Sequence, residues 1–116
     1  MVINNAAAAD RVFRALADPT RRRILERLAR RDHVVGELVE QFDMSQPAVT
    51  KHLNVLAEAR LVSRHRRGRE RVCRLEPAAL RHSAEWIEAC RTLWSARLDA
   101  LETLMTDIQS GKEPSR

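Results

Sequence analysis

The stretch DMSQPAVTKHLNVLAEARLVSRHRRGRERVCRL, residues 43–75, combines two patterns that together decide the fold. Its first half repeats apolar residues at helical spacing and predicts a helix over 46–58, with Ser45 as the expected N-cap. Its second half, 61–75, has apolar ends and a polar centre that contains Gly68, which is typical of a β-hairpin. The buried stripe of the helix should consist of Val49, Leu53 and Leu56. A helix followed directly by a basic hairpin favours a winged helix-turn-helix.

Four further helices are expected around this stretch, because the chain is poor in Gly and β-branched runs. They should cover residues 8–17, 19–31, 35–42 and 77–109. Asp18 is placed to cap the second of these helices. The fold class is therefore mainly α with a small β-hairpin, in which the helices before and after the break at 43–45 form the helix-turn-helix.

Length and composition narrow the classes of protein. With 116 residues the chain fits one domain, expected over 1–109, followed by a flexible tail over 110–116. No apolar run approaches the ~18 residues of a membrane span. The start of the chain lacks a secretory signal, and two cysteines far apart in the sequence suggest reduced thiols. We therefore expect a cytoplasmic protein without a membrane partner.

Basic charge gathers in residues 1–75, which hold 16 Lys and Arg against 9 Asp and Glu. Such a surface favours double-stranded DNA as the partner, because neutralised phosphates dominate these affinities. Arg outnumbers Lys 19 to 2, so a GC-rich genome could also produce the excess. Composition therefore allows nucleic acid without requiring it.

The exposed face of helix 46–58 and the hairpin carry the candidate DNA contacts. Side chains at the N-terminal part of a helix in the major groove reach base edges, which suits Gln46 and Thr50. The arginines of the hairpin suit the phosphate backbone or the minor groove. His52 borders the buried stripe, so it could touch a phosphate or serve as a partly buried structural histidine. The predicted DNA-contacting residues are Ser45, Gln46, Pro47, Thr50, Lys51, His52, Asn54, Arg64, Arg66, Arg67 and Arg69.

Three segments of the chain carry a family resemblance: ALADPTRRRILERL (15–28), VVGELVEQFDMSQPAVTKHLNVLAEARLV (34–62) and GRERVCRLEP (68–77). They resemble the ArsR/SmtB family of bacterial winged-helix repressors over about residues 8–108. The resemblance implies a homodimer with two recognition helices on an inverted repeat. It also implies repression, possible autoregulation and release by an effector. The sequence marks no pocket for that effector.

The resemblance further implies that the first helix and the helix over 77–109 form the dimer. The latter helix carries an apolar stripe at steps of three and four residues. Its predicted dimerisation residues are Trp86, Ile87, Cys90, Trp94, Leu98, Leu101 and Met105. This tryptophan-containing helix looks like the subgroup that lacks the usual metal site.

The metal sites of the family are not matched in this chain. Its metal sensors carry Cys-x-Cys where this sequence has Val34-Val35-Gly36, and the alternative site on the last helix would have only His82. We therefore expect no metal and no cofactor. An irregular metal site remains an alternative, built from His33, His65, Cys73 or His82. Arg60 stands where the family usually has Gly, at a position that favours a left-handed conformation.

The last predictions concern the reactivity of the two cysteines and the absence of catalytic motifs. Cys73 is expected to be exposed among arginines that lower its pKa, which makes it the candidate redox-reactive thiol. Cys90 fits a small buried hydrophobe better than a redox switch. No phosphate-binding loop, nucleophile elbow or HExxH motif occurs, so an enzyme is not expected. The other function left open is a winged-helix module whose basic face binds an acidic protein.

Overall fold

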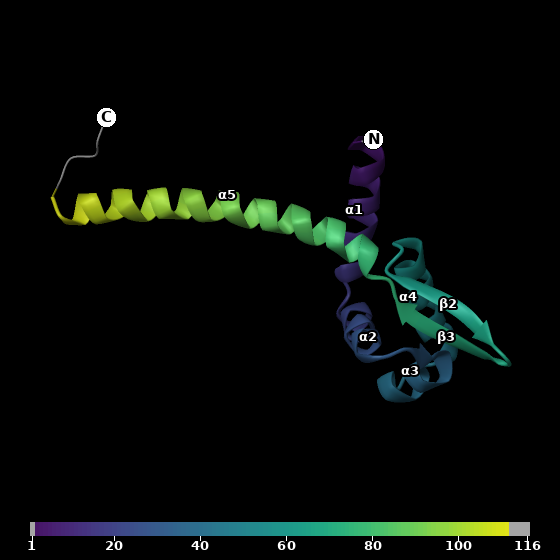
Figure 1. Ribbon diagram of the computed structural model, residues 1–116. Coiled ribbons are helices and arrows are strands. Elements are labelled where there is room, and N and C mark those ends of the chain that lie inside the picture. Colours follow the sequence, from purple (N-terminus) through teal and green to yellow (C-terminus); the bar gives the residue numbers. More distant parts are fainter. Residues whose placement is uncertain (1, 112–116) are drawn as a thin grey trace. The chain divides into compact units, whose positions relative to one another are not determined.

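The computed structural model describes residues 2–111 and has the predicted winged helix-turn-helix architecture (Figure 1). Its elements in chain order are α1 (Val2–Leu16), α2 (Pro19–Arg30), β1 (His33–Val34), α3 (Val35–Phe42), α4 (Gln46–Glu58), β2 (Val62–Arg67), β3 (Glu70–Leu75) and α5 (Pro77–Gln109). The fold class is confirmed as mainly α with a small antiparallel sheet. Most of the predicted tail, residues 112–116, lies outside the described residues.

The helix starts follow from short polar signals. The carboxylate of Asp18 accepts a hydrogen bond of 3.0 Å from the Arg21 N–H, which caps α2 as predicted. The Ser45 hydroxyl accepts one of 3.3 Å from the Ala48 N–H and caps α4. At α3 the capping residue is Val34, which has no acceptor in its side chain. These caps fix where the helices of the helix-turn-helix begin.

The first helix is longer than the sequence pattern predicted. It begins at Val2, whereas apolar periodicity supported a start near residue 8. The added turns include the alanine run at 6–9, which gives no amphipathic signal although alanine has the highest helix propensity. Periodicity therefore identified the helix but not its beginning.

The sheet has three strands in the order β1-β3-β2, one more than the predicted hairpin. Strands β2 and β3 pair in register from Val62 opposite Leu75 to Arg67 opposite Glu70. The turn between them has a φ of 63° at Gly68, a left-handed value that favours glycine. On the other side of β3, His33 pairs with Cys73. A strand of two residues shows no alternation, which is why the sequence did not reveal β1.

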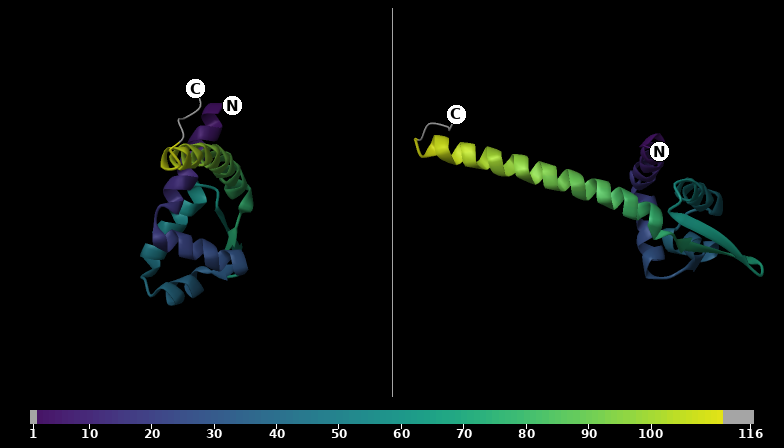
Figure 2. Two further views of the ribbon diagram at one scale, coloured as in Figure 1. Left: turned by 90° about the vertical axis from the view of Figure 1, so that its left-hand side faces the viewer. Right: turned by 45° about the horizontal axis from the view of Figure 1, so that its top comes forward.

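The described chain forms two compact units, with the first ending at Ser83 and the second beginning at Ala84. The first unit holds the hydrophobic core, to which every element from α1 to β3 except β1 contributes a buried side chain. Figure 2 shows α2, α3 and α4, in blue to teal, grouped beside the hairpin. The buried residues of the hydrophobic core are Val12, Ala15, Ile24, Leu25, Leu28, Leu38, Val49, Leu53, Leu56, Ala59, Leu61, Val62 and Cys73. The predicted stripes of α2 and α4 therefore both face this core.

The second unit is a single helical segment in its described part. Residues 84–109 continue α5, and a lone helix cannot bury its own apolar side chains. No helix among residues 2–111 is sufficiently long and apolar to cross a membrane.

The prediction that Cys73 is an exposed, activated thiol is wrong. Its side chain is fully buried, and this burial raises the pKa of the thiol, although the positive charge of Arg64 lowers it in part. Cys73 lies on the central strand of the sheet, and its side chain belongs to the hydrophobic core of the first unit. Because only the thiolate is reactive, this environment disfavours oxidation or metal binding at Cys73.

The end of α4 confirms that Arg60 occupies a left-handed position. Its φ is 61°, its N–H donates to the Ala57 carbonyl at 3.0 Å, and the Leu61 N–H donates to the Leu56 carbonyl at 3.0 Å. This pair of bonds is the Schellman arrangement, in which glycine is preferred at the position of Arg60. The turn thus contains backbone strain that a glycine would not have.

We predict that Arg60→Gly stabilises the first unit by about 1 kcal/mol, because a left-handed residue with a Cβ costs roughly that amount. Urea unfolding followed by circular dichroism measures the change. Arg23→Gly is the matched control, since Arg23 is exposed within α2. It should destabilise by about 0.5–1 kcal/mol. A loss of stability in Arg60→Gly similar to that in Arg23→Gly would contradict the assignment of strain.

Candidate nucleic-acid interface

The exposed face of α4 brings together five of the predicted DNA contacts. Gln46, Pro47, Thr50, Lys51 and Asn54 line one shallow groove of about 430 Å³. All of them are exposed except Thr50, which is half-buried. This face has hydrogen-bond donors and acceptors, an apolar ring and one positive charge, which are the groups that contact base edges and phosphates. Two predicted contacts of this segment do not line the groove: Ser45 caps the helix, and His52 is half-buried.

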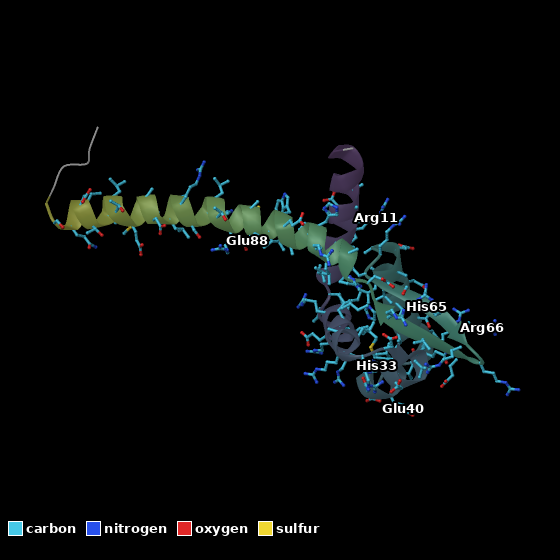
Figure 3. All side chains as sticks on the ribbon, viewed as in Figure 1. Arg11, His33, Glu40, His65, Arg66 and Glu88 are labelled. Atoms are coloured by element: carbon cyan, nitrogen blue, oxygen red, sulfur yellow. The ribbon has the colours of Figure 1, made fainter. Side chains whose placement is uncertain are left out.

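The hairpin of β2 and β3, here called the wing, holds its arginines in two different states. Arg66, Arg67, Arg69 and Arg71 are exposed, and their side chains form no hydrogen bond or ion pair among the described residues, although the strand backbones pair with each other. Arg66 lies on the wing away from the helices (Figure 3). These four guanidinium groups keep all their donors available for phosphate oxygens.

The other wing arginines are engaged with the body of the first unit. Arg64 donates to the side-chain carbonyl of Asn54 at 2.7 Å, so the wing is hydrogen-bonded directly to α4. Arg74 forms an ion pair of 3.1 Å with Asp32, which precedes β1. The prediction grouped Arg64 with the DNA contacts, whereas its geometry in the free protein is that of a residue that positions the wing.

His52 faces inward from α4. It is half-buried, and its Nδ1 lies 3.4 Å from Nη1 of Arg21 and 3.8 Å from Oδ2 of Asp18. Of the two interpretations left open by the sequence, this placement favours the structural histidine.

Arg21 was not singled out by sequence reasoning, yet it joins three helices. Besides its contact with His52 on α4, its guanidinium donates to the carbonyls of Ala15 at 2.7 Å and Arg14 at 3.0 Å. These carbonyls lie in the last turn of α1, where helices have acceptors without an intrahelical i+4 donor. The Arg14 carbonyl also accepts a hydrogen bond of 3.2 Å from the Ala17 N–H. A helix end followed within a few residues by an arginine in the first turn of the next helix could have signalled this contact.

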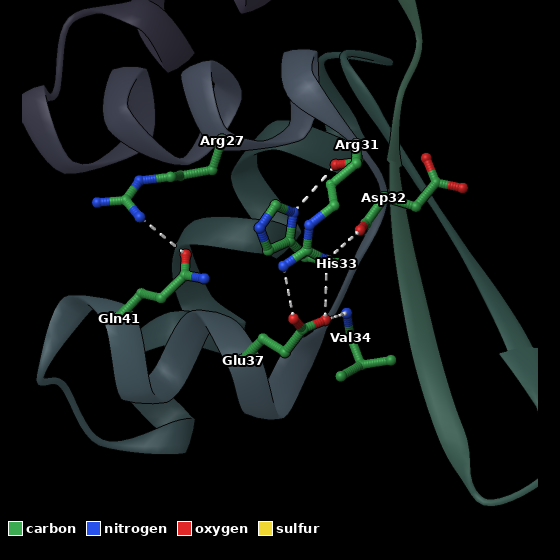
Figure 4. Close-up of polar contacts among 7 residues, drawn as sticks. All are labelled: Arg27, Arg31, Asp32, His33, Val34, Glu37 and Gln41. Carbon is green, nitrogen blue, oxygen red and sulfur yellow. Dashed lines mark hydrogen bonds and ion pairs between the residues drawn. The ribbon is translucent and has the colours of Figure 1, made fainter.

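The junction of β1 and α3 is held by a small polar network (Figure 4). Glu37 accepts from the Arg31 guanidinium at 2.8 Å and from the Val34 N–H at 3.0 Å. Both contacts favour the carboxylate and lower the pKa of Glu37 to about 2. His33 is buried, with its Nδ1 3.0 Å from the Arg31 carbonyl. The network fixes the backbone at Val34, where α3 lacks a side-chain cap.

Of the residues proposed for an irregular metal site, His33 and Cys73 are cross-strand partners, but the four do not assemble a site. Within residues 2–111, no group of three or more His, Cys, Asp or Glu side chains is arranged to hold a metal ion. His65 contacts the Ser63 hydroxyl at 2.9 Å, whereas His33 lies against a backbone carbonyl. The described part of the chain therefore gives no support to the irregular site.

Known proteins share both the sequence and the fold of this chain. Residues 18–64 match the family model described as bacterial regulatory protein, arsR family. The transcriptional repressor SdpR of Bacillus subtilis is 40% identical over 76 residues, which cover 66% of this chain and 84% of SdpR. The HTH-type transcriptional regulator Rv2034 of Mycobacterium tuberculosis is 51% identical over 61% of this chain and 66% of its own length. An ArsR-like transcriptional regulator from Rhodococcus sp. RHA1 has a TM-score of 0.72 at 35% identity, over 87% of this chain and 95% of that chain.

The contact between Arg64 and Asn54 generates a prediction that needs no DNA. In a double-mutant cycle of Arg64→Ala and Asn54→Ala, we expect a coupling energy of about 0.5–1 kcal/mol, because one hydrogen bond is lost in each single variant. Urea unfolding of the four proteins measures it. The matched cycle of Arg66→Ala with Asn54→Ala should give no coupling, since Arg66 has no described partner. Equal coupling in the two cycles would mean that Arg64 does not position the wing.

Proposed function

Because the chain belongs to the arsR family of bacterial regulatory proteins, we propose that it represses transcription as a homodimer on an inverted repeat of double-stranded DNA. Membership of this family makes it a DNA-binding transcriptional repressor and not an enzyme. The homodimer, the inverted repeat and release by an effector other than a metal are the parts that we propose. Such a repressor would act in the cytoplasm and could control its own gene.

The observation that carries the proposal is the combined surface of α4 and the wing. An α-helix fits the major groove, and the exposed residues of the first turns of α4 are those that would reach base edges. Gln46 suits an adenine edge, and Thr50 offers a hydroxyl and a methyl group. Arg66, Arg67 and Arg69 lie on the same unit with free guanidinium groups, which suits phosphates flanking the site or the minor groove.

The homodimer is supported by the apolar stripe of the second unit. Large apolar side chains recur along α5 and are exposed in a single chain: Trp86, Ile87, Leu93, Trp94, Leu98, Leu101, Leu104, Met105 and Ile108. Contiguous exposed apolar surface of this kind marks an interface. The predicted dimerisation residues, including the half-buried Cys90, fall on this stripe. With a second copy, and with α1 contributing, two recognition helices would read half-sites about one or two helical turns apart.

A non-metal effector is supported by the chemistry of the residues near α3. Val34, Val35 and Gly36 provide no thiolate or imidazole. The buried Cys73 has a raised pKa, which opposes the deprotonation that a soft metal requires.

Two substitutions separate base reading from phosphate binding. We predict that Thr50→Ala reduces the preference for the operator over scrambled DNA by about tenfold, because a base contact is worth roughly 1–3 kcal/mol. Arg67→Ala should weaken both duplexes equally and lower the salt slope by about one unit. Fluorescence anisotropy across a salt series measures both, with the duplex upstream of the protein's own gene tested against a scrambled one.

Wild-type protein should prefer the upstream duplex by ~10³-fold or more. If both variants lose operator and scrambled binding in the same ratio, the division of roles is wrong. If the wild type binds neither duplex, the proposed function fails and the basic face becomes a candidate for an acidic protein partner.

A substitution on the stripe tests the dimer. Leu101→Lys should yield monomers in analytical ultracentrifugation and lose tight operator binding, because it places a charge at the centre of the apolar stripe. Thr103→Lys is the matched control, since it adds the same charge next to Asp99 and Asp107 on the polar side of α5. A Leu101→Lys protein that remains dimeric would contradict the role of α5.

A further inference from the structure

A groove of about 520 Å³ lies where α4, the wing and the junction of β1 and α3 meet, all within the first unit. Its apolar lining comes from Val34, Val35 and Leu53, together with the backbone of Gly36. The two valines are half-buried, so the groove leaves part of their surface in water. Sites for small organic ligands have this size and combine apolar walls with a few polar groups.

The polar lining of the groove is mostly cationic. Arg64, Arg69 and Arg71 line it against a single acid, Glu70. Arg64 uses one nitrogen for Asn54, whereas Arg69 and Arg71 contact no acid or carbonyl within the described chain. Unpaired guanidinium groups beside apolar surface favour a ligand that has both an anionic group and an apolar body.

Gly36 borders the apolar side of the groove. It lies in the first turn of α3, and its φ is not positive, so its backbone does not require glycine. A Cβ built at this position meets no atom within 4 Å, so close packing does not require glycine either. Because Gly36 lines the groove, a large side chain at this position is expected to reduce the open volume beside Val34 and Val35.

Gln46 and Thr50 form the remaining wall, and both belong to the proposed DNA-reading face. We propose that the groove binds a small organic anion with an apolar body, such as an aromatic carboxylate, and that the bound anion excludes DNA from α4. Its carboxylate pairs with the free arginines of the wing, and its apolar part covers Val34 and Val35. The regulatory consequence rests on the proposed function, whereas the binding site itself does not.

A DNA phosphate alone would use only part of this chemistry. It would pair with the arginines but leave the apolar floor in water, so it gains nothing from Val34 or Val35. The apolar part of the ligand is thus what distinguishes an organic anion from the nucleic-acid backbone.

The test uses the full-length protein without DNA and naphthoate as the probe, followed by nuclear magnetic resonance of the backbone amides. Naphthalenemethanol has the rings without the charge, and acetate has the charge without the rings. Naphthoate should bind at least about tenfold tighter than either, because it engages both parts of the groove. The largest shifts should fall on residues 34–36 and 69–71.

Three variants locate the site. Gly36→Leu should weaken naphthoate binding by about tenfold or more, since its side chain fills the floor. Arg71→Gln should weaken it about threefold or more through the lost charge. Arg23→Gln removes the same charge from the exposed face of α2 and should leave the affinity unchanged. Undiminished binding to Gly36→Leu, equal binding of naphthalenemethanol, or shifts confined to α5 would each overturn the site.

Competition with DNA is measured separately on the duplex upstream of the gene. At a naphthoate concentration ten times its wild-type Kd, wild-type binding to this duplex should weaken by about tenfold, whereas Gly36→Leu binding should weaken by about twofold or less. Unchanged DNA affinity in the wild type at saturating naphthoate would overturn the exclusion mechanism. Failure of the unliganded wild type to prefer its operator would overturn the proposed function instead, and the naphthoate titration would still decide the groove.

Discussion

The burial of one side of α4 is the constraint on which the rest of the structure depends. Val49, Leu53 and Leu56 have no more than 1% of their surface exposed, so α4 can rotate only by exposing its apolar stripe. Removing three such side chains from water contributes several kcal/mol, about 1.5–3 for each. Because the helix is fixed in this way, Gln46 and Lys51 must face solvent. The orientation of the proposed DNA-reading face is therefore a consequence of core packing.

The wing depends on the same helix through polar contacts. Arg64 joins it to Asn54 of α4, and Arg74 joins it to Asp32 before β1, so contacts on both sides restrain the hairpin. Each contact is exposed and individually weak. These two contacts position the wing: they hold its base in place and leave the arginines near the turn free. The six arginines of the hairpin thus divide into two that position it and four that remain available for an anion.

The sequence predicted those parts of the fold that depend on local chemistry. The caps at Asp18 and Ser45 and the glycine in the wing turn are encoded within a few residues, and all three lie where expected. The burial of Cys73 could not be read in this way. It depends on the hydrophobic core, whose side chains come from helices far away in the sequence and meet Cys73 only in the folded chain. Local charge suggested an activated thiol there, but desolvation by burial is the larger effect.

The candidate site likewise has parts that the local sequence encodes and parts that only tertiary structure creates. The exposed face of α4 follows from helical periodicity, whereas the Arg64–Asn54 bond and the groove beside Gly36 arise from segments that meet only in the folded chain.

The number of predicted phosphate contacts in each copy bears on the proposed dimer. One copy offers Lys51 and three wing arginines from the predicted contacts, about four phosphate neutralisations. Two copies would give about eight and a salt slope near −7. Affinity at physiological salt would then require the pair, so assembly through α5 would become a condition for repression.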